Sequence, residues 1–66
     1  MYFISDYFRN LIAKVGGVEN FATIYGLSVK TISEWLNGTR KAQINSLIAV
    51  SAIVGLGADK WELLTA

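Results

Sequence analysis

A run of polar and short apolar side chains in the middle of the chain is suited to recognising base pairs. Lys30 can donate hydrogen bonds to guanine acceptors, and Glu34 can accept one from a cytosine amino group. Val29 and the Thr31 methyl group can contact a thymine methyl group, and Ser33 can hydrogen-bond to a base or a phosphate. We therefore expect this run to contact the edges of bases in double-stranded DNA.

The residues around this run are suited to phosphate groups. Arg40 and Lys41 are adjacent, and Asn37 and Thr39 come just before them. Side chains of these types set the register of a protein on a duplex and give salt-dependent affinity without reading sequence. We expect these four residues to contact the DNA backbone, and we include Ser28 among the base-reading residues.

Few residues are available for other kinds of chemistry. The chain has no cysteine and no histidine, which excludes a disulfide framework, a zinc finger, a thiol nucleophile and a histidine-based triad. No acidic residue occurs in a recognisable catalytic spacing, and a core this small leaves little room for a pocket. We expect no enzymatic activity, no metal, no cofactor and no small-molecule substrate.

Glycines and capping residues divide the 66 residues into five predicted helices, and no proline interrupts them. Ser5 is the expected N-cap of the first helix, whose apolar stripe contains Ile4, Phe8, Leu11, Ile12 and Val15 and which ends at Gly16 and Gly17. The other predicted helices are Val18 to Tyr25, the residues after Ser28 to Asn37, Ile44 to Val54, and Ala58 or Asp59 to Leu64. We therefore predict one all-α domain over residues 1–66.

The second and third predicted helices have the spacing of a helix-turn-helix, over residues 18–37. Ala22 is the small residue where the helices touch, and Gly26 supplies the turn. Ile32 and Trp35 hold the third helix against the body, which leaves its polar side outward. In this arrangement the third helix, Val29 to Asn37, enters the major groove.

The stretch from Gly17 to Leu64 resembles the lambda-repressor-like helix-turn-helix domains of phage C-repressors, Cro proteins and bacterial relatives. The segments that carry the resemblance are Gly17–Ala22, Gly26–Lys41 and Trp61–Leu64. It implies a compact five-helix domain, dimeric binding to operator DNA, and transcriptional control. It also implies base reading by Val29, Lys30, Ser33 and Glu34 and a phosphate contact by Asn37. The chain departs from the family pattern in having Gly17-Val18 where a glutamine often opens the second helix, and Ala42 where a proline is favoured.

The fourth predicted helix carries no charged residue on any side, so it requires apolar cover on more than one face. In a domain this small we expect a second subunit to supply part of that cover. The predicted homodimer interface contains Ile53, Val54, Leu56 and Trp61. A dimer would place two reading helices one DNA turn apart, about 34 Å.

The net charge of +1 is low for a nucleic-acid-binding domain, and it leaves other interpretations open. Lys30 and Glu34 are four residues apart and can simply pair on a solvated helix face. The alternative function is a protein-interaction or antitoxin-type module that has the same fold and weak or absent DNA binding.

The chain from Ala42 to Ala58 has no charge, but its polar residues and glycines argue against a membrane span, which needs about 20 predominantly apolar residues. The N-terminus lacks the basic start and long apolar core of a signal peptide. We expect a cytoplasmic domain with no membrane partner, in a bacterium or a phage-infected bacterial host.

Overall fold

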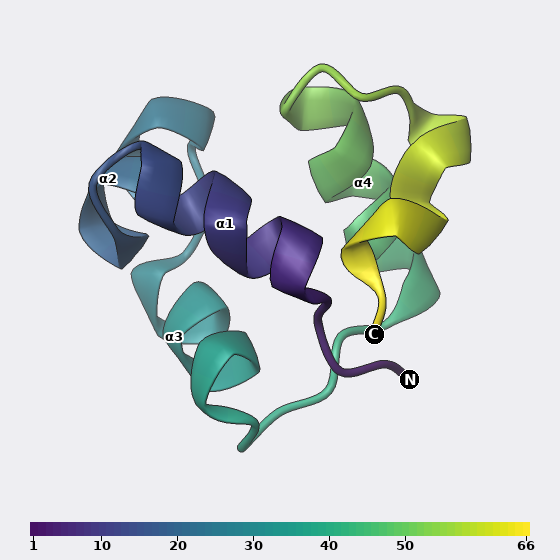
Figure 1. Ribbon diagram of the computed structural model, residues 1–66, viewed down its shortest axis with the longest axis horizontal. Helices are drawn as coiled ribbons and strands as arrows, with labels where there is room; N and C mark the ends of the chain where they lie inside the picture. The colour runs from purple at the N-terminus through teal and green to yellow at the C-terminus, as the bar shows by residue number, and fades with distance from the viewer.

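The computed structural model describes all 66 residues and contains five helices and no strand (Figure 1). The helices are α1 (Asp6–Lys14), α2 (Val18–Tyr25), α3 (Val29–Asn37), α4 (Ile44–Ile53) and the 3₁₀ helix η1 (Ala58–Leu64). The prediction of an all-helical fold is confirmed. The longest helix, α4, has 10 residues, and no helix has the length and apolar character needed to cross a membrane.

Local capping explains where the helices begin and end. The Ser5 hydroxyl accepts a hydrogen bond from the Phe8 amide at 3.1 Å, and the Ser28 hydroxyl accepts one from the Thr31 amide at 3.2 Å. Gly26 and Gly38 end α2 and α3 with φ angles of 66° and 78°, a left-handed conformation that a side chain disfavours. These four ends were predicted from residue type alone.

Two predicted details of the helices are wrong. Ile4 does not belong to the first helix, because Ser5 is the N-cap and the helix begins at Asp6. Ile4 is buried all the same, in extended chain that forms an antiparallel bridge with Thr65. The predicted fourth helix is one residue too long, since Val54 is the C-cap rather than a helical residue.

The connection between α3 and α4 contains a backbone pairing that the sequence did not predict. Ala42 is completely buried and forms an antiparallel bridge with Tyr2. The two hydrogen bonds of this bridge measure 2.8 and 2.7 Å between nitrogen and oxygen. The pairing ties the N-terminal segment to the α3–α4 connection, and no local sequence pattern marks it because the partners are far apart in the chain.

One hydrophobic core joins all five helices. Its centre contains aromatic rings: Phe8 of α1 lies 5.9 Å from Phe21 of α2 and 6.1 Å from Trp35 of α3, between ring centroids. Trp35 is only 5% exposed, which confirms it as a core residue. Trp61 is half-buried, with its ring edge against Tyr2 at a centroid distance of 5.6 Å.

The helices pack in two groups, which α1 connects. α3 packs mainly on α2, whereas α4 packs mainly on η1, and α1 contacts both α2 and η1. Figure 1 shows α1 crossing between these groups, with α3 on one side and the α4–η1 pair on the other. The arrangement leaves the facing sides of α3 and α4 only loosely packed against each other.

The uncharged helix α4 obtains much of its cover from its own chain. Leu47, Val50 and Ser51 are buried, and η1 lies against the helix. The buried Ser51 hydroxyl donates a 2.6 Å hydrogen bond to the Gly57 carbonyl oxygen, at the start of η1. This bond fixes η1 on α4, because it satisfies a polar group that has no access to water.

Replacing Ser51 by alanine should therefore lower the free energy of unfolding by about 1–2 kcal/mol, through loss of a buried hydrogen bond. Urea denaturation followed by circular dichroism measures the change. The matched control is Thr23→Ala at an exposed position of α2, which should change stability by no more than about 0.5 kcal/mol. Equal midpoints for Ser51→Ala and the unmodified chain would contradict this role.

Candidate nucleic-acid interface

α2 and α3 are joined by a short turn that fixes their relative orientation. The Leu27 amide donates to the Ala22 carbonyl oxygen at 2.9 Å, so the chain turns sharply after Gly26. Ala22 is buried where α2 meets the rest of the domain, and Ile32 and Trp35 are buried on the inner side of α3. All three residues predicted to face inward are therefore in the core.

The opposite side of α3 remains accessible. Lys30 and Asn37 are exposed on it, as are Ser28 and Val29 at its beginning. Thr31, Ser33 and Glu34 are half-buried. None of the six predicted base-reading side chains is in the core, and the structure brings them together along one helix.

Arg40 folds back over the outer side of α3. Its Nη1 atom lies 3.5 Å from the Glu34 carboxylate and 3.5 Å from the Thr31 hydroxyl. The backbone assists, since the Arg40 amide donates to the Glu34 carbonyl oxygen at 3.3 Å. The pair is exposed and contributes little to stability, but it holds a guanidinium group beside two predicted base-reading residues.

The pairing of Lys30 with Glu34, which their spacing also allowed, does not form. The only salt bridge in the structure is the one between Arg40 and Glu34. The turn after α3 returns Arg40 to the Glu34 carboxylate, whereas Lys30 extends from the exposed beginning of the helix. Lys30 therefore has an ammonium group without an acidic partner.

The turn after α3 is organised by Asn37. Its side-chain oxygen accepts hydrogen bonds from the Thr39 amide at 3.0 Å and from the Thr39 hydroxyl at 2.7 Å. The amide nitrogen of Asn37 makes no hydrogen bond within the protein and is exposed. Asn37 thus shapes the turn with its oxygen and keeps its two N–H donors available.

Lys41 is directed toward the N-terminal segment. Its Nζ atom lies 4.8 Å from the centroid of the Phe3 ring, a distance at which the ammonium group is attracted to the ring face. Asn37, Thr39, Arg40 and Lys41, the four predicted backbone-contacting residues, are all exposed. Two of them, Arg40 and Lys41, already have partners inside the molecule.

Arg9 is a positioning residue that the sequence did not reveal. Its Nη1 atom donates a 2.8 Å hydrogen bond to the Leu36 carbonyl oxygen in the last turn of α3. A cation at a helix C-terminus is favoured by the helix dipole. No sequence signal indicates this contact, because it joins α1 to α3 across 27 residues.

The predicted dimer residues differ in their exposure. Ile53 is 47% exposed at the end of α4, whereas Val54, Leu56 and Trp61 are half-buried and pack against the core. Most of the surface of these three residues is already covered within the chain. Ile53 is the member of the set that most clearly presents an uncovered apolar side chain.

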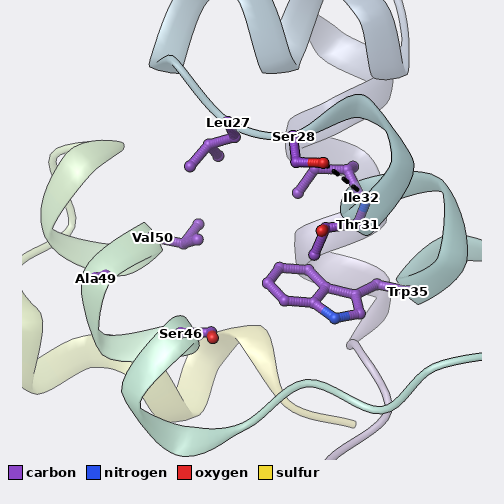
Figure 2. Close-up of a pocket in the computed structure, with 8 residues that line it drawn as sticks. All are labelled: Leu27, Ser28, Thr31, Ile32, Trp35, Ser46, Ala49 and Val50. Carbon is purple, nitrogen blue, oxygen red and sulfur yellow. Dashed lines mark hydrogen bonds between the residues drawn. The ribbon is translucent and has the colours of Figure 1, made fainter.

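Two cavities lie between α3 and α4. The first has a volume of about 220 Å³ and is shown in Figure 2. It is lined by Leu27, Ser28, Thr31, Ile32, Trp35, Ser46, Ala49 and Val50. The second, of about 140 Å³, is lined by Met1, Thr31, Trp35, Arg40, Lys41, Gln43 and Ser46. Three residues, Thr31, Trp35 and Ser46, border both cavities.

Replacing Arg9 by glutamine should destabilise the domain by about 0.5–1.5 kcal/mol, because the last turn of α3 loses a charge-assisted hydrogen bond. Urea denaturation measures the stability, and hydrogen exchange of the Leu36 and Asn37 amides locates the effect. Lys60→Gln, at an exposed cation of η1, is the charge-matched control. Equal loss in both variants would show that net charge, and not the contact with α3, is responsible.

Comparisons with known proteins leave the chain without an assigned family. No family model, no curated protein and no solved structure matches it. What the chain binds is therefore inferred from the geometry of α3 and its surroundings.

Proposed function

We propose that the chain is a sequence-specific DNA-binding domain in which α2 and α3 act as a helix-turn-helix over residues 18–37. One observation carries the proposal: the apolar side of α3 is buried while all of its predicted base-reading residues keep solvent access. A helix held in this way enters the major groove with its N-terminal residues against the base edges. The helix before it then crosses the phosphate backbone.

The unpaired ammonium group of Lys30 is the strongest candidate for direct reading. It lies in the first turn of α3, where a helix in the major groove comes closest to the bases. Lysine donates to guanine N7 and O6, and a good base contact discriminates against the wrong base by about 1–3 kcal/mol. Val29, exposed beside it, is suited to a thymine methyl group.

Arg40 and Asn37 are the proposed backbone contacts at the other end of α3. The two free N–H groups of Asn37 can donate to a phosphate oxygen. Arg40 can exchange its long contact with Glu34 for a phosphate, which would leave the Glu34 carboxylate free to accept from a cytosine amino group. The exposed ion pair is weak, so this exchange costs little.

We propose further that the domain acts as a homodimeric, Cro- or repressor-like regulator of transcription that blocks polymerase by occupying an operator. The net charge of +1 gives a single domain few phosphate contacts. Two copies double those contacts and place two α3 helices about 34 Å apart, on successive turns of a palindromic site. Ile53 at the exposed end of α4 is the proposed centre of the dimer surface, together with Val54, Leu56 and Trp61.

A second candidate is a protein-interaction or antitoxin-type module. The observations that favour it are the acidic Glu34 on the reading side and two exposed apolar residues nearby in the chain, Ile24 at 58% and Val29 at 44%. Such a surface would suit a protein partner. Binding to DNA falls steeply with salt, whereas binding to a protein through apolar contacts does not, so the salt dependence separates the two candidates.

Selection from random duplexes with the purified chain should enrich one sequence, and Lys30→Ala should alter that sequence at one position per half-site. The reason is that a side chain in contact with a base edge controls only that base pair. The expected affinity loss on the original site is about 1–3 kcal/mol. Sequencing the enriched pools and fluorescence anisotropy measure the two effects.

Lys60→Ala is the matched control, because it removes an exposed lysine from η1, on the other side of the molecule from α3 (Figure 1). It should keep the enriched sequence unchanged. A uniform loss of affinity across all duplexes for Lys30→Ala would make Lys30 a phosphate contact. Failure of the unmodified chain to enrich any sequence at low salt would contradict the proposed function.

Ile53→Glu should convert the dimer to a monomer, because a carboxylate on the proposed interface is buried without a partner. Sedimentation velocity measures the change in mass. Ile24→Glu, which introduces the same charge at an exposed isoleucine of α2, should leave the dimer intact. If both variants sediment like the unmodified chain, this end of α4 is not the interface.

A further inference from the structure

We propose that the two cavities between α3 and α4 together form a binding site for a small apolar carboxylate. The cavities adjoin, because Thr31, Trp35 and Ser46 border both. Ligand pockets are typically about 300–1,000 Å³, so each cavity alone is small and the pair reaches the lower end of that range. The two cavities differ in chemistry, and that difference defines the ligand.

The larger cavity accepts an apolar group. Five of its eight lining residues are hydrophobic, and none is charged. Its volume of about 220 Å³ exceeds the ~150 Å³ of an engineered apolar cavity that holds benzene. Figure 2 shows the Trp35 indole extending from α3 toward Val50 of α4, with Leu27 above the space between them. This cavity is therefore suited to one aromatic ring or a short branched chain.

The smaller cavity accepts an anionic group. Arg40 and Lys41 line it, Gln43 and Ser46 add polar hydrogen-bonding groups, and no acidic residue borders either cavity. The Arg40 guanidinium already lies 3.5 Å from the Thr31 hydroxyl, another residue of the shared border. A carboxylate here would meet Lys41, and it would meet Arg40 once it displaces the Glu34 carboxylate that lies 3.5 Å from Arg40 Nη1. Arginine is well suited to binding a carboxylate through two hydrogen bonds.

An unsatisfied donor lies at the border between the cavities. Trp35 is 5% exposed, and its indole Nε1 is buried with no hydrogen-bond partner. Buried polar atoms in folded proteins almost always have a partner, so an unpaired one requires an explanation. In Figure 2 the indole nitrogen lies at the end of the larger cavity where Ser46 is found. A small rotation of the Trp35 ring would let a ligand oxygen at this border accept the missing hydrogen bond, since the nitrogen has almost no accessible surface in the unliganded chain.

A ligand at this site would touch α3 directly. Ser28, Thr31 and Trp35 belong to α3 or its N-cap, while Ala49 and Val50 belong to α4. Since α3 and α4 pack mainly on other helices, an occupant between them would change how firmly α3 is held. A carboxylate would also draw Arg40 away from the outer side of α3. An effect on DNA affinity rests on the proposed function, whereas binding of the ligand does not.

The test is a titration of the isotopically labelled chain with 3-phenylpropanoate, followed through the Trp35 indole N–H resonance by two-dimensional NMR. The Trp61→Phe variant assigns the two indole signals. A saturable shift of the Trp35 signal is expected. The uncharged 3-phenylpropanamide should bind about tenfold more weakly, because it loses the charge-assisted hydrogen bonds.

Two pairs of variants locate the site. Ala49→Phe fills the larger cavity and should abolish the shift, while Ala52→Phe, at an exposed position of α4 outside the cavity lining, should preserve it. Arg40→Gln should weaken binding about tenfold, while Lys60→Gln should not. Circular dichroism of each variant confirms that it is folded.

Three outcomes would overturn the proposal: no saturable shift at millimolar 3-phenylpropanoate, undiminished binding by folded Ala49→Phe, or equal affinity for the acid and the amide. DNA binding is measured separately on the unliganded chain. Binding of the carboxylate without binding of DNA would support the ligand site and contradict the proposed function. Binding of DNA without binding of the carboxylate would do the reverse, so the two failures are distinguishable.

Discussion

The contact between Trp35 of α3 and Phe8 of α1, together with that between Phe8 and Phe21 of α2, holds the first three helices in one orientation. These rings are buried, so each contributes apolar area as well as a specific geometry. Because these contacts bury one side of α3, they also determine which side of the helix faces solvent. With little packing between α3 and α4, any movement of the aromatic rings would reorient the proposed reading helix.

Features that depend on residues close together in the sequence could be predicted, whereas features that depend on residues far apart could not. Helix ends at Ser5, Gly26, Ser28 and Gly38 depend on a residue and its neighbours within one turn, and sequence reasoning located them. The bridge between Tyr2 and Ala42 joins segments with no periodic pattern and was missed. The 3₁₀ geometry of η1 was not predicted either. In a segment this short, the spacing of apolar residues is the same for a 3₁₀ helix as for an α-helix.

The candidate interface shows the same division. Helical periodicity placed Lys30 and Glu34 on the outer side of α3, which is a property of the helix alone. Which cation would pair with Glu34 depends on the path of the chain after the helix, and that path favours Arg40. Arg9 and the cavities between α3 and α4 arise only when separate elements come together. Such features have no signature in a single sequence.

The cover that η1 gives to α4 has a consequence for solubility. A 3₁₀ helix has poorer hydrogen-bond geometry than an α-helix, and η1 lies near the chain end, so local opening is expected to begin there. Such opening uncovers the side of α4 that packs on η1, and this helix has no charged residue. Apolar patches exposed in this way lead to aggregation. We therefore expect aggregation in concentrated solution to follow fraying of η1 rather than melting of the whole domain.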